Sequence, residues 1–570
     1  MVFLRFKKIN GKKYWYFVEN YYDKGRVKQR IVLWVGNTEK LFNYLRSGLV
    51  SVNNIEIGKV KDYGAVVSLH ELFQELNLIN KINELMPKRS SNWVDIGRLT
   101  EIMVINRLIA QKSNNSIRSW YKNTILPDLL KLPEDKLYSQ LFYRALDHFT
   151  EDSIEKLEKY LIKTAQIKFG IEIRQVFYDI TSFYLEGATC ELAEFGYSRD
   201  HRPDKKQIVF GLVILPTNKF PILYKIYRGN TADVSTTIEI MEKIKRLYEI
   251  EDFTSIIDRG MISDNVRLEL FKNNIKYISS LDSNSNELKD LIKIVSRKSF
   301  RKIILNNGRI VYARGITGCI KELRKRYNIK NKSKRKFREL DEVRFKYIIG
   351  KSPEISFEKK EAFIEKLAGA IKNLKEFQDN YNLKSRNTGR GRPVNIGSRI
   401  NLILNGISKY FDINWVILND KLKIEVKMDW KLIKTTLRNL GRFVLVSSDL
   451  NLSTKKIVQA YIDKFQIEQT FRFLKTDMKI RPFWLRKKNR VIAYFFISYL
   501  AYFLKCIIEY RLKKSRIKMS FNKVLNELGE IKIVSIIINK EKVEKISKMT
   551  TVQQKILKSL KIDITRNCQT

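Results

Sequence analysis

The order of predicted elements between residues 173 and 281 constrains the fold more than any other feature of this sequence. Three strand-like runs come first, at 173–187, 206–217 and 220–229. A helical pattern at 236–250 follows, then a strand at 253–260, a helix at 265–274 and a strand at 275–281. Alternating apolar periods of two and of 3.6 residues distinguish these strands from these helices.

A last helix completes this order, and residues 461–475, YIDKFQIEQTFRFLK, supply it. At about 100° per residue, four side chains point to one face of roughly 60°: Tyr461, Lys464, Glu468 and Lys475. An apolar face lies next to it and is able to pack on a core: Ile467, Phe471 and Leu474. The row of charge is either a functional site or a solvated face. With this helix, the element order is that of an RNase H-like domain.

The length of 570 residues indicates several domains. We predict an α/β fold with a mixed five-stranded sheet and helices as its RNase H-like core, interrupted by a large insertion. The predicted parts are 1–165, a small hairpin followed by helices; 166–284 and 441–510, the two parts of the core; 285–440, an insertion subdomain; and 511–570, a C-terminal region that could serve dimerisation. The mainly helical N-terminal region either reads DNA ends or is an ordinary helical bundle.

Charge points to a nucleic-acid partner. The chain has 109 basic and 61 acidic residues, a net charge of +48. A protein this basic binds polyanions, of which double-stranded nucleic acid is the foremost example. Alternatively, codon bias accounts for part of the positive charge, because Lys, Asn and Ile are all abundant, as expected from an AT-rich genome.

Cysteine and histidine patterns exclude other metal chemistry. The four cysteines lie far apart without CxxC spacing, and the three histidines are scattered, so neither a zinc site nor a disulfide framework is indicated. Carboxylates must then hold any metal, which favours Mg²⁺ or Mn²⁺. The start of the chain lacks a signal peptide, and the apolar run at 491–504 is too short to span a bilayer. We expect a buried helix there, no membrane association, and a cytoplasmic, nucleoid-associated protein.

Two aspartates interrupt strand-like apolar runs. Asp179 lies in VFYDITSF, and Asp258 closes SIIDRG before Gly260. A charge in such a run is costly unless it is exposed at a cleft or binds something. One such Asp is most often an edge or turn residue. Two on neighbouring strands indicate a carboxylate pair at one end of a sheet, and Glu468 is the candidate third carboxylate of a site for two divalent ions.

These blocks resemble bacterial insertion-sequence DDE transposases of the insertion sequence four superfamily, whose signature is Tyr-x2-Arg-x3-Glu-x6-Lys. Similarity continues through 196–214, 227–236 and 480–504. The resemblance implies that Asp179, Asp258 and Glu468 hold two Mg²⁺ or Mn²⁺ ions. One ion would activate water at the element end and the other would stabilise the leaving 3′ oxygen, after which the 3′-OH attacks target DNA.

Further residues are candidate DNA contacts. The resemblance extends this role to Tyr461, Lys464, Lys475 and Arg259, with Lys464 in the place of the signature Arg, so that charge is kept without the bidentate fork. Tyr461 either adds a hydroxyl contact or merely packs. His201 either touches DNA or lies in a surface turn. Arg390 and Arg392 belong to an RGRP sequence that is either an AT-hook core or a basic loop.

The sequence thus predicts a metal-dependent, cut-and-paste DNA transposase acting on terminal inverted repeats and target DNA as a homodimer in a synaptic complex. The alternatives are a DNA-binding protein from a decayed element that no longer cleaves, and a structure-selective nuclease with the same core.

Overall fold

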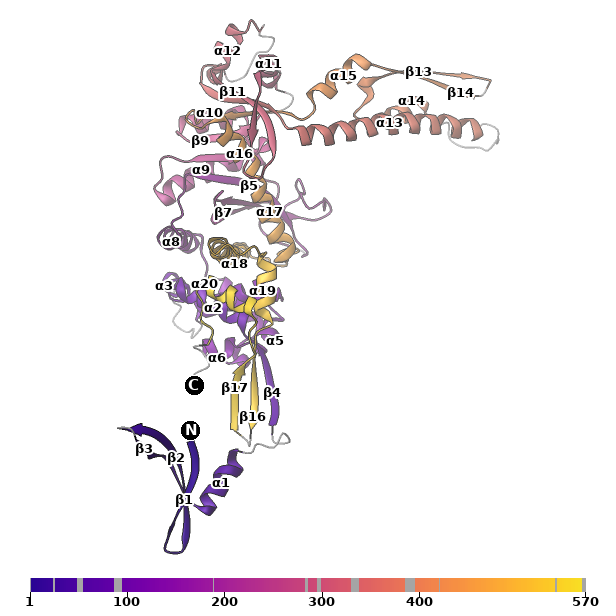
Figure 1. Ribbon diagram of the computed structural model, residues 1–570. Helices are drawn as coiled ribbons and strands as arrows, with labels where there is room; N and C mark the ends of the chain where they lie inside the picture. The colour runs from indigo at the N-terminus through magenta and orange to yellow at the C-terminus, as the bar shows by residue number, and fades with distance from the viewer. Residues whose placement is uncertain are drawn as a thin grey trace. The chain divides into compact units, whose positions relative to one another are not determined.

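The computed structural model describes eleven segments of the chain (Figure 1): residues 2–23, 26–48, 55–86, 95–187, 189–281, 285–294, 299–329, 338–384, 395–419, 421–538 and 541–565. The chain divides into two compact units. One consists of Met1–Leu157 and Asn489–Thr570, and the other of Glu158–Lys488.

A nine-stranded mixed sheet forms the centre of the second unit, in the order β10-β11-β12-β15-β9-β8-β5-β6-β7. Its strands are β5 (Gln175–Tyr184), β6 (Gln207–Ile214), β7 (Pro221–Arg228), β8 (Thr254–Ile257), β9 (Lys276–Ser280), β10 (Arg301–Ile304), β11 (Ile310–Gly318), β12 (Phe345–Lys351) and β15 (Arg442–Ser447). All eight residues of β6 and all four of β8 are buried. Their near-continuous apolar runs are typical of strands covered on both faces.

Five of these strands follow the order β7-β6-β5-β8-β9. β5, β6 and β7 pair antiparallel, whereas β5, β8 and β9 pair parallel. Parallel neighbours need a crossover, and helices α9 (Asp233–Tyr248) and α10 (Asp264–Lys272) provide the two connections. These elements match the predicted runs between residues 173 and 281.

The prediction of a five-stranded sheet was wrong, because four more strands extend the sheet beyond β9. β15 pairs antiparallel with β9, β12 with β15, β11 with β12 and β10 with β11. Three of the four come from residues 285–440, the range predicted as a separate subdomain. Their buried apolar side chains continue the core, Tyr347, Ile348 and Ile349 of β12 among them.

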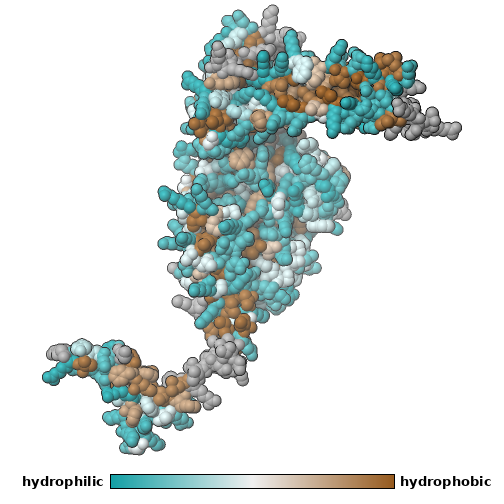
Figure 2. All heavy atoms as spheres, turned by 45° about the vertical axis from the view of Figure 1, so that its right-hand side comes forward, coloured by the Kyte–Doolittle hydropathy of each residue, from teal (hydrophilic) through white to brown (hydrophobic). Residues whose placement is uncertain are grey.

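Only part of that range has a core of its own. Helix α13 (Pro353–Lys384) packs on the hairpin of β13 (Phe411–Leu418) and β14 (Lys421–Met428), with α14 (Ile396–Ile403) and α15 (Trp430–Asn439) beside them. Asn382 and Gln378 of α13 hydrogen-bond to backbone groups of β14. Figure 2 shows hydrophobic residues along this segment, where Phe357 and Ile364 are exposed.

The second unit further contains α11 (Asn286–Ile294), α12 (Ile320–Arg326), α16 (Thr454–Asp463) and α17 (Phe465–Arg472), the π-helical turn Phe473–Asp477, and short 3₁₀ turns at Arg259–Met261, Arg338–Asp341 and Ser408–Tyr410. α16 packs near β9, β11, β12 and β15, and α17 packs near β5.

The first unit joins the two ends of the chain. Its elements are β1 (Val2–Ile9), β2 (Lys12–Asp23), β3 (Arg26–Asn37), α1 (Thr38–Gly48), β4 (Ile55–Asp62), α2 (Gly64–Glu75), α3 (Leu78–Leu85), α4 (Ile96–Ile109), α5 (Ile117–Tyr121), α6 (Leu126–Leu130), a 3₁₀ turn (Glu134–Lys136), α7 (Ser139–Leu146), the start of α8 (Glu151–Phe169), α18 (Lys488–Lys514), α19 (Phe521–Gly529), β16 (Lys532–Ile538), β17 (Glu541–Ile546) and α20 (Thr551–Leu560). β16 pairs with both β4 and β17, so the C-terminal region completes a sheet with the N-terminal one.

One element of this unit differs from its sequence prediction, and another agrees with it. The predicted N-terminal hairpin is a three-stranded sheet, β1-β2-β3. The apolar run at 491–504 lies in α18, as the predicted buried helix. This described helix is long and apolar enough to cross a membrane by length and composition, but 89% of its apolar window is buried inside the protein.

A buried ion pair links α10 to α11 beneath the sheet. Arg267 lies 2.8 Å from Glu287, and each side chain is only 4% exposed. Tyr277 of β9 accepts a hydrogen bond from Arg267, and Tyr347 of β12 donates one to Glu287. Both charges therefore have polar partners in a place that water does not reach.

Arg267→Met should destabilise this unit by about 3–5 kcal/mol, because it leaves the Glu287 carboxylate buried without its cation. Urea unfolding of the full chain measures the loss. The double variant Arg267→Met, Glu287→Leu removes both charges and should recover most of the stability. Equal losses in the single and the double variant would contradict the role assigned to the pair.

Candidate active site

Two aspartates come together where the parallel pairing of two neighbouring strands, β5 and β8, ends. Tyr178 of β5 is the partner of Ile257 of β8. Asp179 and Asp258 are the next residue on each strand, and adjacent strands lie about 4.8 Å apart. Asp179 accepts a hydrogen bond from the Ile180 amide, and Asp258 accepts one from the Arg259 amide, each at 2.8 Å.

Lys464 neutralises part of this acidic pair. Its Nζ lies 3.0 Å from Oδ1 of Asp258, and its side chain is 8% exposed, against 45% for Asp258. Burial raises the pKa of the Asp179 carboxyl to about 6, the Lys464 charge opposes this rise, and the Asp258 charge adds to it. Burial lowers the pKa of Lys464, but the charges of Asp258 and Asp179 outweigh burial and raise it overall.

The helix that carries Lys464 has a local irregularity at that residue. α16 ends at Asp463 and α17 begins at Phe465, so Lys464 caps both, and the π-helical turn begins at Phe473. The predicted helix forms, and Lys464 keeps right-handed helical dihedral angles, φ −55° and ψ −26°, between α16 and α17. A π turn changes the angle per residue, which separates Lys475 from the row.

Glu468 lies one turn after Lys464 on α17 and is exposed. Among the residues that the structure describes, no three His, Cys, Asp or Glu side chains form a group that could hold a metal ion. The structure thus brings Asp179 and Asp258 together with Lys464, whereas Glu468 stands outside this group. Ile467 and Phe471, the predicted apolar face, are buried, and Phe471 packs edge-on against Phe210 of β6.

Tyr461 is held at the edge of the site. Its hydroxyl is 2.9 Å from Oγ of Ser280, the last residue of β9. The Lys464 ammonium lies 5.9 Å from the centre of the Tyr461 ring, and burial raises the pKa of the Tyr461 hydroxyl. Tyr461 thus ties α16 to the strand next to β8.

Lys475 reaches a second buried carboxylate, which the sequence analysis did not single out. Its Nζ lies 2.8 Å from Oδ1 of Asp200, whose side chain is only 1% exposed, and Arg481 pairs with the same oxygen. Burial lowers the pKa of Lys475, although the Asp200 carboxylate opposes this shift. The lysines of the row therefore pair with two separate aspartates.

Asp200 belongs to a loop that two glycines hold against the sheet. A Cβ at Gly196 would lie 2.1 Å from the Gly229 carbonyl oxygen, and one at Gly229 would lie 2.0 Å from the Gln207 carbonyl oxygen. Only glycine allows this approach. The next residue before Asp200, Arg199, pairs with Asp233 at 2.5 Å. The glycines of GYSRDH and YRGNT were the sequence signal for this loop.

The other predicted contacts lie at the surface or outside the described residues. Arg259 is exposed in the short turn after Asp258. His201 is an exposed turn residue with a positive φ of 55°. Arg390 and Arg392 lie outside the described residues. Their contacts with DNA stay predictions, as do those of Tyr461, Lys464 and Lys475.

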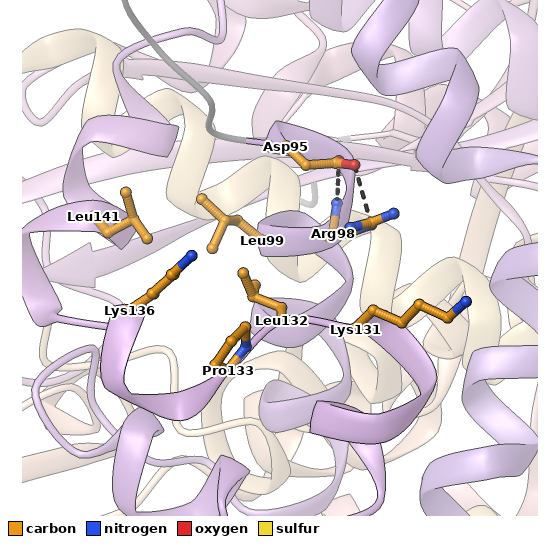
Figure 3. Close-up of a pocket in the computed structure, with 8 residues that line it drawn as sticks. All are labelled: Asp95, Arg98, Leu99, Lys131, Leu132, Pro133, Lys136 and Leu141. Atoms are coloured by element: carbon orange, nitrogen blue, oxygen red, sulfur yellow. Dashed lines mark hydrogen bonds and ion pairs between the residues drawn. The ribbon is translucent and has the colours of Figure 1, made fainter.

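A pocket in the first unit has a different character (Figure 3). It is lined by Asp95, Arg98, Leu99, Lys131, Leu132, Pro133, Lys136 and Leu141. Asp95 caps α4 by accepting from the Arg98 amide and also pairs with the Arg98 side chain. Its one carboxylate is thus engaged in holding a helix start, and the pocket contains no predicted site residue.

The aspartate pair fits a divalent metal ion. Carboxylate oxygens are the ligands that Mg²⁺ and Mn²⁺ prefer. The raised pKa of Asp179 means that the protein alone does not fully compensate its ionised form. A further cation beside Asp179 and Asp258 would supply that compensation.

The fold and the site define a class, an α/β protein with two aspartates side by side on adjacent strands that pair in parallel. The family model described as a transposase DDE domain matches residues 172–504, more than half of the chain. The chain belongs to this family, whose enzymes generally depend on divalent metal ions.

Other comparisons add little to the family match. No curated protein matches the chain. Among solved structures, the chain is similar to a piggyBac transposase in a synaptic complex with hairpin DNA, at 11% identity over 83% of this chain and 82% of that chain, with a TM-score of 0.35. The assignment to a family of transposases therefore depends on the family match.

Asp200→Asn should lower the stability of the second unit at neutral pH by about 1.5–3 kcal/mol, because Lys475 and Arg481 lose a charged partner. Without the carboxylate, the pKa of Lys475 should fall further below its unfolded value. The loss should then shrink as pH rises from about 8 to about 10, where the buried lysine deprotonates.

Urea unfolding at several pH values measures this effect. Asp204→Asn is the matched control, since Asp204 pairs with Arg202 at the surface of the same loop, and little change is expected. A loss for Asp200→Asn that stays constant between pH 7 and pH 10 would rule out the buried Lys475 charge as its cause.

Proposed function

We propose that this transposase cleaves DNA at the ends of a mobile element by divalent-metal-dependent phosphoryl transfer and joins the freed 3′-OH ends to target DNA. The observation that carries the proposal is the β5–β8 register, in which Asp179 and Asp258 directly follow the pair Tyr178 and Ile257. We further propose an RNase H-like core, which the order β7-β6-β5-β8-β9 supports, and membership in the insertion sequence four superfamily.

In this proposal Asp179 and Asp258 bind divalent ions, and Glu468 is the third ligand. Glu468 follows Lys464 by four residues on a helix, a spacing that puts two side chains on neighbouring turns of one face. The bound ions supply an activated water and stabilise the leaving 3′ oxygen.

The protein's own residues position the DNA. The hydrogen bond between Tyr461 and Ser280 fixes α16 against β9. The ammonium group of Lys464 lies beside Asp258. Lys464 and Lys475 cannot be metal ligands, because cations repel one another, so we assign them to phosphates of the DNA end. Two element ends must be joined, which calls for a homodimer in a synaptic complex.

Asp179→Ala, Asp258→Ala and Glu468→Ala should each reduce Mg²⁺-dependent nicking by at least about 10³-fold, because metal-borne charge stabilisation carries most of this chemistry. DNA binding should survive. Asp252→Ala is the control, since Asp252 is an exposed aspartate on the turn before β8 that pairs with Lys276, and full activity is expected.

Nicking of plasmid DNA carrying the element ends, with purified variants, measures the effect. Near wild-type nicking by any one of the three variants removes that residue from the ligand set. A strand-transfer assay on the same DNA separates a transposase from a nuclease, which would cut without joining. Absence of nicking by the wild-type chain would favour a DNA-binding protein from a decayed element.

Lys464→Ala and Lys475→Ala should weaken binding to cleaved element ends more than binding to random duplex, because the lysine contacts that position the phosphates of the end are lost. Lys464→Arg should retain end binding, since it keeps the charge and adds a bidentate fork. Lys272→Ala, at an exposed lysine of α10, is the control. Gel shifts at fixed salt measure these affinities. Equal losses of affinity for both DNAs would mean that the lysines only contribute to a general basic surface.

A further inference from the structure

The three-stranded sheet at the start of the chain is strongly basic. Residues 1–37 contain nine lysines and arginines and only two acidic residues. β2 pairs antiparallel with both β1 and β3, with Arg5 opposite Tyr16 and Tyr16 opposite Trp34. Directly opposite residues of an antiparallel pair share a face, so the register assigns each side chain to one of two faces.

One face of the sheet carries cationic side chains together with side chains that form hydrogen bonds. We call it the reading face and define it by Arg5, Lys7, Lys12, Tyr14, Tyr16, Asn20, Gln29 and Trp34. Gln29 donates to Asn20 at 2.8 Å and accepts from Arg5. This chain of hydrogen bonds crosses all three strands at the protein surface, and Ile31 lies exposed beside it.

The two acidic residues of the sheet lie on the opposite face. Glu19 pairs with Arg30 at 2.7 Å, and Asp23 pairs with Lys28 at 2.6 Å. Apolar side chains of β1 and β2 share that opposite face, among them Leu4, Phe6 and Trp15. Among the described residues of the sheet, three cations and no carboxylate lie on the reading face, and five cations with the two carboxylates lie on the opposite face. Both faces are therefore complementary to a polyanion, and the reading face is distinguished by its hydrogen-bonding amide groups and by the absence of carboxylates.

The aromatic rings of the reading face already stack on each other. Tyr16 and Trp34 lie 5.3 Å apart at 7°, and Tyr14 and Trp34 lie 6.4 Å apart at 22°. A single-stranded nucleic acid is held by bases that stack on free ring faces. Here the rings stiffen the sheet instead, and the groups directed to a partner are guanidinium, ammonium and amide groups. This arrangement favours a duplex over a single strand.

We propose that the reading face recognises base edges in the major groove of double-stranded DNA, an inference that rests on the proposed function and locates its sequence recognition. The major groove, about 12 Å wide, admits β-strands. Arg pairs with guanine and Asn or Gln with adenine there, and apolar side chains contact the thymine methyl group. Arg5, Asn20, Gln29 and Ile31 supply these groups, while Lys7 and Lys12 supply charge for phosphates.

The test is selection of bound sequences from a random duplex library by the full-length chain. Wild type should enrich one motif. The double variant Asn20→Ala, Gln29→Ala should lose one or two positions of that motif, and its affinity for the wild-type motif should fall about 5- to 150-fold per lost contact. Its affinity for random duplex should not change, because amides carry no charge.

Two further variants make the result independent of misfolding. Gln29→Glu keeps the shape of the side chain and should shift the preferred base toward cytosine, whose amino group a carboxylate accepts. Lys13→Ala removes a cation from the opposite face, where Lys13 lies over the Phe6 ring, and should enrich the wild-type motif.

Enrichment of the unchanged motif by the double variant would overturn the inference, as would tighter binding of single-stranded DNA or RNA than of duplex. Asp179→Ala is run in parallel and should enrich the wild-type motif without nicking it. Failure of the reading face therefore shows in the motif, whereas failure of the proposed function shows in nicking by the wild-type chain.

Discussion

The parallel pairing of β5 with β8 is the constraint on which the site depends. It is built from two stretches, QVFYDITSFY, in which seven of ten residues are buried, and TSII, in which all four are buried. Because the pairing ends at Tyr178 and Ile257, Asp179 and Asp258 lie at the same level of the sheet, although β5 continues to Tyr184. A shift of one residue in this register would turn one of the two aspartates to the other side of the sheet. The buried strands thus hold Asp179 and Asp258 side by side, although the two negative charges repel each other.

Lys464 explains how such a pair persists in the folded protein. Burial makes the ionised form of Asp179 costly, and the neighbouring Asp258 charge adds to this cost, so that the pKa of Asp179 rises to about 6. The buried ammonium of Lys464 lies against Asp258 and offsets part of that cost. A second buried carboxylate is compensated in the same way, because Asp200 pairs with both Lys475 and Arg481. The helical segment 454–477 is therefore fastened to the sheet region by two lysines as well as by its apolar face.

The sequence predicted the parts of this arrangement that depend on local patterns. Asp179 and Asp258 interrupt apolar runs, and the order of strands and helices between 173 and 281 follows from periodicity, so both could be read from the chain. The extension of the sheet by β12 and β15 could not, because antiparallel pairing between distant segments leaves no local signal. The β10–β11 hairpin does have one, the Asn307-Gly308 turn, which the sequence analysis overlooked. The π turn at Phe473 was also missed, since an assumed 3.6-residue period cannot detect a change of period. Asp200 was missed because a buried aspartate in a loop looks like an ordinary turn residue until its two cations are placed.

The central claim is that a divalent ion binds between Asp179 and Asp258. Replacing Mg²⁺ with Fe²⁺ and adding ascorbate and peroxide generates radicals that cut the polypeptide next to the bound iron. The account predicts two cuts, close to residues 179 and 258, that excess Mg²⁺ suppresses and that Asp258→Asn abolishes. Cuts confined to other regions, such as the pocket around Asp95, or cuts at 179 and 258 that persist in Asp258→Asn, would contradict it.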